Sequence, residues 1–123
     1  ALPMAFLATA NAEAARTFYS DTLGLPLLED TPFAIVYGIG PVVLRIQKVE
    51  TVTHAPGTAL GWTVEDLDRT AAALSDRGVS WLRFPGMEQD ASGAWTAPGG
   101  ARIAWFRDPD GNVLSLTQEP PAS

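Results

Sequence analysis

The sequence predicts an α+β protein in which one β-α-β unit occurs twice. Residues 4–9 form a short apolar run, and Asn11 after it is a good helix cap. Residues 58–64 form a second strand-like run, and Asp66 can cap the segment that follows. In both copies apolar residues then recur at helical spacing. A repeated order of strand, cap and helix indicates that two copies of one module make up the fold.

The two copies also agree in their spacing. Asn11 lies seven residues after Met4, and Asp66 lies seven residues after Ala59. The apolar faces of the two predicted helices are Ala15, Phe18 and Thr22 in the first copy, and Leu67, Ala71 and Leu74 in the second. This agreement predicts that both helices start at the same distance from the first strand of their module.

A glycine ends each predicted helix, and an apolar residue then opens a strand. The pairs are Gly24-Leu25 and Gly78-Val79. The remaining strands are expected at 25–29, 33–37 and 41–48 in the first module, and at 79–84, 101–107 and 112–118 in the second. We expect one domain over residues 1–123, with module one at about 1–50, module two at about 57–118 and a polar tail at 119–123. The modules differ most at residues 85–100, a loop longer than its counterpart.

The composition narrows the classes of partner. Hydrophobic residues make up 46 % of the 123 residues and charged residues 18 %, which is typical of a folded globular chain. The net charge is −6 and the eight basic residues are scattered, so neither nucleic acid nor an anionic membrane is an expected partner. The absence of cysteine suits a cytoplasmic protein.

Three motifs stand in a specific order along the chain. They are Phe18-Tyr19 followed by Leu23-Gly24-Leu25, the run Gly61-Trp62-Thr63-Val64-Glu65-Asp66, and the turn Asp108-Pro109-Asp110-Gly111-Asn112. With them the chain resembles the vicinal oxygen chelate superfamily, which includes glyoxalase I, extradiol dioxygenases, fosfomycin resistance enzymes and bleomycin resistance proteins. The resemblance implies two βαβββ modules forming a curved mixed sheet, with helices on the convex face and a ligand cavity on the concave face. Modules of this kind pair within one chain or across a dimer, and the resemblance leads us to expect a homodimer.

Enzymes of this superfamily hold a divalent metal through His, Gln or Glu side chains on four strands. Counted from the motifs, these positions fall on Met4, on or near Val43, on Ala59 and on Ser115. None of these residues is a good ligand for a hard or borderline metal ion. The only histidine, His54, lies in a turn-like segment. We therefore expect no metal of the family type and no other cofactor.

Strand alternation predicts which side chains share the concave face. Apolar residues on alternate positions should pack against the helices, so their neighbours point the other way. The candidate ligand-binding residues are Phe6, Arg45, Gln47, Thr63, Trp95, Trp105 and Ser115. Trp105 alternates with Phe106, so one of the two should face the cavity. The inward positions assigned on the first, fourth, fifth and last of the predicted strands carry no Asp or Glu, and no nucleophile pattern is present, so no catalytic residue is assigned.

Two candidates have open alternatives. Arg45 can hold a ligand carboxylate through two parallel hydrogen bonds, or it can form a structural ion pair with Glu29, Glu88 or Asp90, or be exposed at the cavity mouth. Trp95, in the long loop, can stack on a planar ligand or anchor its own loop.

Three functions fit this pattern. The first is a metal-free small-molecule-binding protein of the glyoxalase/bleomycin resistance type, with a hydrophobic or aromatic ligand that can be anionic. The alternative is a metal-dependent glyoxalase- or dioxygenase-like enzyme with displaced metal ligands. The third is a structural or regulatory module with a vestigial cavity. The fold alone does not choose between them.

Overall fold

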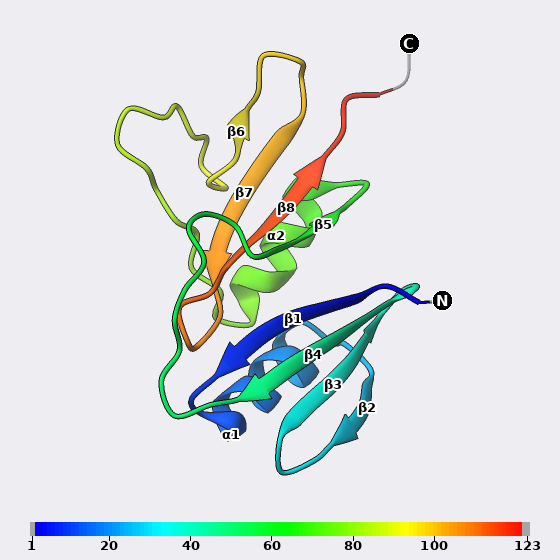
Figure 1. Cartoon of the computed structure of the whole chain (residues 1–123). Helices are drawn as coiled ribbons and strands as arrows, with labels where there is room; N and C mark the ends of the chain where they lie inside the picture. The colour runs from blue at the N-terminus through cyan, green and yellow to red at the C-terminus, as the bar shows by residue number, and fades with distance from the viewer. Residues whose placement is uncertain (1, 122–123) are drawn as a thin grey trace. The chain divides into compact units, whose positions relative to one another are not determined.

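The computed structural model describes residues 2–121 as two compact units, each with one four-stranded mixed sheet (Figure 1). The first unit comprises Ala1–Ala55 and Asp108–Asn112, and the second comprises Pro56–Arg107 and Val113–Ser123. Residue 1 and residues 122–123, the end of the predicted polar tail, lie outside the described residues.

Both units follow the predicted βαβββ order. The first contains β1 (Met4–Thr9), α1 (Ala12–Arg16), η1 (Thr17–Thr22), β2 (Leu27–Asp30), β3 (Ala34–Ile39) and β4 (Val42–Lys48). The second contains β5 (Leu60–Thr63), α2 (Leu67–Asp76), β6 (Trp95–Thr96), β7 (Arg102–Arg107) and β8 (Val113–Gln118). The strand orders are β1-β4-β3-β2 and β5-β8-β7-β6. In each sheet the first strand lies parallel to the last strand of its module, and the other pairs are antiparallel.

The first helix begins as predicted but does not stay regular. The Asn11 side chain accepts a hydrogen bond of 3.1 Å from the Ala14 amide and caps the helix. From Thr17 onwards the helix widens to the π form, in which the Leu23 amide donates to the Phe18 carbonyl five residues back. Gly24, with a φ of +70°, then ends the helix in the left-handed conformation that glycine adopts without strain.

The strand expected at 25–29 starts two residues later, at Leu27. The Leu25 amide still donates to the Tyr19 carbonyl at the helix end, and Pro26 has no amide hydrogen for a ladder. The ladder with β3 therefore begins only after the proline.

Each sheet packs one face against the helix of its own unit. In the first unit Leu7, Ile35, Ile46, Leu44 and Tyr37 share this face and are buried together with Ala15 and Tyr19 of the helix. In the second unit the buried set is Leu114, Leu116, Ala104 and Phe106 with Leu67, Ala71 and Leu74 of α2. The prediction was right for the alternation of Leu44 with Ile46 and of Leu114 with Leu116, and for the α2 face of Leu67, Ala71 and Leu74. The predicted face of the first helix was wrong in part: Ala15 is buried, but Tyr19 takes the next buried place four residues on, whereas Phe18 and Thr22 are only half-buried.

The strand expected at 79–84 does not form. That segment makes only an isolated bridge between Trp81 and Phe106, and the fourth strand of the sheet is the short β6 inside the long loop. Two segments therefore share the edge of β7 that faces away from β8. Trp81 pairs with Phe106 near one end, and Trp95 of β6 pairs with Ile103 near the other. Among the described residues, no helix has both the length and the apolar character needed to cross a membrane.

Candidate functional site

We call the side of each sheet that faces away from the helix of its own unit the helix-free face. In the first unit the side chains on this face come from alternate positions of the four strands. The paired rows are Met4, Val43 and Gly38; Phe6, Arg45, Val36 and Glu29; and Ala8, Gln47 and Ala34. Three predicted ligand-binding residues, Phe6, Arg45 and Gln47, therefore lie on one surface.

This surface is largely apolar around one positive charge. Phe6 is 56 % exposed and Met4 51 % exposed, although both are large hydrophobic side chains. Arg45 lies directly between Phe6 and Val36 across the sheet. Within the described residues of its own unit it has no carboxylate partner within 4 Å and no hydrogen bond. Glu29, the expected structural partner in the same unit, therefore does not pair with it.

The sheet registers identify which residues of the two modules correspond. Met4 is the counterpart of Ala59, because each lies seven residues before its helix cap. Met4 pairs with Val43 and Phe6 with Arg45, whereas Gly61 pairs with Ser115. Phe6 and Gly61 lie two residues after Met4 and Ala59, so they correspond to each other, and their strand partners Arg45 and Ser115 correspond as well. The metal-ligand position that the resemblance implies on the fourth strand of module one therefore falls on Arg45, two residues after Val43, and carries a guanidinium instead of a carboxylate.

These positions do not fit a metal ion. Met4 offers a thioether, Ala59 and Val43 offer no donor, Ser115 offers a neutral hydroxyl, and Arg45 carries a positive charge. The described part of the chain contains no group of three or more His, Cys, Asp or Glu side chains placed to bind a metal. A divalent cation of the family type would therefore find no adequate set of ligands here.

The helix-free face of the second unit carries the other four predicted residues. One row across the sheet is Gly61, Ser115 and Trp105, and the next is Thr63, Thr117, Ile103 and Trp95. Trp105 occupies this face, because its neighbour Phe106 is fully buried on the helix side against Trp81. The pairing thus brings Thr63, Trp95, Trp105 and Ser115 together.

Three aromatic rings lie close to each other on this face. The rings of Trp95 and Trp105 have centroids 6.4 Å apart and are inclined by 35°. Phe84 meets Trp105 edge to face at 5.4 Å, a contact that the sequence pattern did not predict. A regular strand at 79–84 was expected, whereas Phe84 lies on an irregular segment that brings its ring against Trp105. The cluster presents a broad apolar surface beside the hydroxyl groups of the adjacent strands.

The loop that carries Trp95 is held by its own polar side chains. The Gln89 amide donates to the carbonyls of Leu82 and Gly93 and accepts from the Phe84 amide, at 2.8–2.9 Å. These bonds use the side chain fully within the loop. Gln89 is therefore a structural residue of the loop.

A charged network fastens the same loop to α2 and β7. Arg102 donates to Asp68 at 2.8 and 3.1 Å and to Asp90 at 2.7 Å. The hydrogen bonds from Arg102 and Ser92 lower the pKa of Asp68. Burial acts to raise the pKa of Asp90, but the hydrogen bonds from Arg102 and the loop backbone outweigh it, so that this pKa is also lowered. The carboxylates are thus committed to holding the loop.

The turn at residues 108–112 also proves structural. The Asp108 carboxylate accepts hydrogen bonds from Tyr19 Oη at 2.7 Å, from the Asp110 and Asn112 amides, and from Asn112 Nδ2. Burial, and then the negative charge of Asp108, raise the pKa of Tyr19 far above its usual value. His54 Nε2 lies 2.6 Å from the Asp110 carbonyl, so this histidine has a backbone partner.

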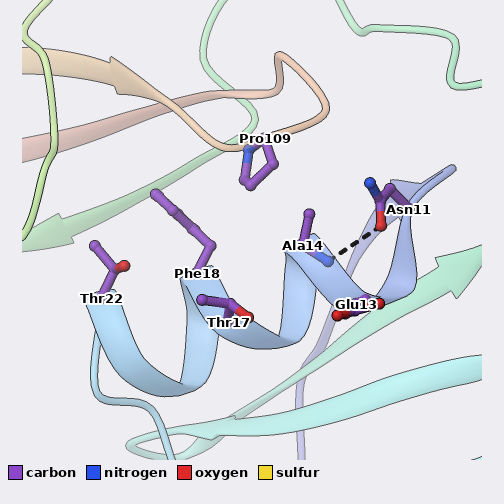
Figure 2. Close-up of a pocket in the computed structure, with 7 residues that line it drawn as sticks. All are labelled: Asn11, Glu13, Ala14, Thr17, Phe18, Thr22 and Pro109. Carbon is purple, nitrogen blue, oxygen red and sulfur yellow. Dashed lines mark hydrogen bonds between the residues drawn. The ribbon is translucent and has the colours of Figure 1, made fainter.

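Each unit also has a surface hollow. In the first unit a hollow of about 450 Å³ lies over the helix, where Ala14 and Phe18 rise on the side of Pro109 (Figure 2). Its Asn11 side chain is already used as the helix cap. In the second unit a hollow of about 570 Å³ lies along the loop beside Trp95. Only Trp95 among the predicted site residues lines either hollow.

Two mixed sheets of the same strand order, each with a helix on one face, define an α+β protein of the repeated βαβββ class. The chain belongs to the Glyoxalase/Bleomycin resistance protein/Dioxygenase superfamily, whose family model matches residues 1–116. The resemblance predicted from the three motifs is therefore confirmed.

Individual relatives agree with this assignment. The chain is 29 % identical over 114 residues to the Bacillus subtilis protein YraH, described as uncharacterized, covering 80 % of this chain and 83 % of YraH. A glyoxalase/bleomycin resistance protein from Catenulispora acidiphila is similar with a TM-score of 0.72 and 25 % identity, covering 98 % of this chain and 100 % of the other. A lactoylglutathione lyase from Agrobacterium tumefaciens has the same fold, with a TM-score of 0.74, 17 % identity and coverage of 96 % and 92 %.

Proposed function

We propose that this protein is a metal-free small-molecule-binding protein, whose ligand is hydrophobic or aromatic and can be anionic. The helix-free faces of the two units are the proposed binding surfaces, with Phe6, Arg45 and Gln47 on the first. Thr63, Trp95, Trp105 and Ser115 are the proposed contacts on the second.

The observation that carries the proposal is the environment of Arg45. Its guanidinium lies on an apolar face beside Phe6, and no described carboxylate of its own unit neutralises it within 4 Å. A guanidinium presents two parallel N–H groups that match a carboxylate. An anionic group on an otherwise apolar ligand would therefore find both its charge partner and its apolar contacts on this surface.

The residue types at the family's metal positions support the same function. The side chains of Met4, Ala59 and Ser115 offer a thioether, a methyl group and a hydroxyl, which do not make a site for a divalent metal ion. The positive charge of Arg45 would repel such an ion. The alternative, a metal-dependent glyoxalase- or dioxygenase-like enzyme, needs ligands from elsewhere. Glu29 is the one acidic residue in the Arg45 row, which gives that alternative a single carboxylate.

Metal analysis of protein purified without chelator separates these two functions. We expect less than one equivalent of Zn²⁺, Ni²⁺, Mn²⁺ or Fe²⁺ to remain after dialysis, and no rise in melting temperature when these ions are added. A stoichiometric ion that raises the melting temperature in the parent protein, but not in Glu29→Gln, would favour the enzyme.

A panel of aromatic and antibiotic compounds tests the binding function itself. We expect at least one class of aromatic ligand to shift the tryptophan emission and raise the melting temperature, because ligand binding to the folded state stabilises it. If none does, the third function, a module with a vestigial cavity, is the better description. We also propose that the protein is cytoplasmic and that it forms a homodimer. Light scattering at several protein concentrations measures the molecular mass and so tests the dimer directly.

A further inference from the structure

Ser115 is a buried polar residue without a partner. It is only 8 % exposed, and among the described residues its hydroxyl group makes no hydrogen bond. Among the described residues, every fully buried side-chain oxygen or nitrogen has a hydrogen-bond partner. Because the Ser115 hydroxyl has none, its oxygen is not fully buried and remains accessible. A buried hydroxyl normally finds a hydrogen bond, so this one is available to a group that approaches from the helix-free face.

The position of the Ser115 hydroxyl follows from its neighbour Gly61. A Cβ atom placed on Gly61 would lie only 2.5 Å from Ser115 Oγ, so the hydroxyl occupies the space above the glycine. Gly61 and Ser115 are direct partners in the parallel pair of β5 and β8. Glycine is therefore the residue that lets the hydroxyl lie along the face, and no side chain from Gly61 covers it.

The other neighbour of Ser115 is an aromatic ring. Trp105 lies directly opposite Ser115 across the antiparallel pair of β7 and β8, where side chains on one face have Cβ atoms about 4.5–5.5 Å apart. Trp95 and Phe84 extend the aromatic surface beyond Trp105. A planar ring stacked on Trp105 would thus place a ring substituent within reach of the Ser115 hydroxyl.

The absence of charged side chains from these two rows favours an uncharged ligand group at this position. The rows Gly61–Ser115–Trp105 and Thr63–Thr117–Ile103–Trp95 contain no ionisable side chain. Hydroxyl groups bind neutral oxygen or nitrogen atoms without the desolvation cost of a charge.

We infer that the helix-free face of the second unit binds an aromatic ring stacked on Trp105, through a hydrogen bond between Ser115 Oγ and an uncharged oxygen or nitrogen atom on or in that ring. This inference rests on the proposed binding function and specifies the chemistry of the aromatic ligand: a phenol, an aryl ketone or a nitrogen heterocycle, rather than a bare hydrocarbon.

The test compares two probes of nearly equal size, 2-naphthol and 2-methylnaphthalene, by titration calorimetry with the full chain. The parent protein should bind 2-naphthol about three- to tenfold more tightly, the range expected for one neutral hydrogen bond. Ser115→Ala should remove this preference and leave the affinity for 2-methylnaphthalene unchanged. Ser80→Ala, an exposed serine of the same unit, is the matched control and should keep the preference.

Gly61→Ala provides a second, independent variant. Its added methyl group collides with Ser115 Oγ, so it should also abolish the preference, and its melting curve shows whether the fold survives. If the parent protein binds both probes equally, or if Ser115→Ala weakens both alike, the inference is wrong while the binding function stands. If neither probe binds the parent protein, the proposed binding of aromatic ligands fails together with the inference.

Discussion

The Tyr19 hydroxyl donates a hydrogen bond of 2.7 Å to Asp108, a residue 89 positions further along the chain. Both residues are buried, and Asp108 in turn accepts three hydrogen bonds from within its own turn. Two of the motifs that revealed the family thus meet in one contact, so their spacing in the sequence reflects a structural requirement rather than a shared ligand site.

Tyr19→Phe should lower the free energy of unfolding by about 1–3 kcal/mol, because it removes one partner of a buried carboxylate. Chemical denaturation gives this value directly. Tyr37→Phe is the matched control: its hydroxyl bonds to Ser20, a neutral partner that is only partly buried, so we expect a smaller loss. An equal loss of unfolding free energy in the two variants would show that the bond to Asp108 stabilises the fold no more than the bond to Ser20 does.

Neither tyrosine of the folded protein should ionise near pH 10. The chain has two tyrosines, and burial raises the pKa of both Tyr19 and Tyr37 above the usual value of about 10. The folded state therefore holds these protons more tightly than the unfolded state. The contribution of the two tyrosines to the free energy of unfolding is therefore fully present below about pH 10 and is lost as the pH rises further. Ultraviolet titration should show tyrosinate appearing at a higher pH in the folded protein than in the denatured protein; superimposable titration curves of the two states would contradict this.

Arg102→Gln should loosen the loop that carries Trp95. The pair partners Asp68 and Asp90 are largely exposed, so after solvent screening the network contributes at most about 1 kcal/mol. Because their pKa values are lowered in the folded state, this contribution is present above about pH 4 and is lost as the pH falls through the folded values. The melting temperatures of parent and variant should therefore converge on acidification. A constant difference down to pH 2 would show that the effect is not ionic.

Arg45→Ala should weaken the binding of 2-naphthoate by about 2 kcal/mol or more, a loss of about 30-fold in affinity. It should reduce the affinity for uncharged 2-naphthol much less. Arg45→Lys should retain part of the affinity as a point charge without the planar fork. Arg69→Ala, an exposed arginine on α2, is the control for net charge. Unchanged binding of 2-naphthoate by Arg45→Ala would remove Arg45 from the site.

Most of the fold could be predicted from local patterns. Caps at Asn11 and Asp66 and the alternation of Leu44 and Ile46, or of Leu114 and Leu116, are properties of short segments, and the structure confirms them. The strand at 79–84 was wrong because its fate depends on distant groups. The Gln89 side chain takes up backbone groups of Leu82 and Phe84, and β6 occupies the other end of the β7 edge.

Phe6, Arg45, Gln47, Thr63 and Ser115 lie on the faces that alternation assigned to them. Alternation left the choice between Trp105 and Phe106 open, and it gave no face to Trp95, which was expected in a loop and lies in β6. Alternation gives a face but not a lateral partner. The placement of Ser115 between Gly61 and Trp105, and of Arg45 between Phe6 and Val36, required the strand registers. The Phe84 contact needed the irregular path of its segment, which has no periodic signal.

The turn at 108–112 has a consequence for how the chain can be divided. It connects β7 and β8 of the second unit, yet it is part of the first unit, where Asp110 binds Thr9 and the Ala10 amide and Asn112 binds the Ala8 carbonyl. A fragment cut after residue 55 would lack the acceptor for Tyr19 and the cap over the end of β1. The two halves repeat one topology, but the first unit includes a turn that lies in the second half of the sequence. A chimaera that takes its second half from a relative should therefore keep residues 108–112 of this chain, so that the turn still matches the first unit.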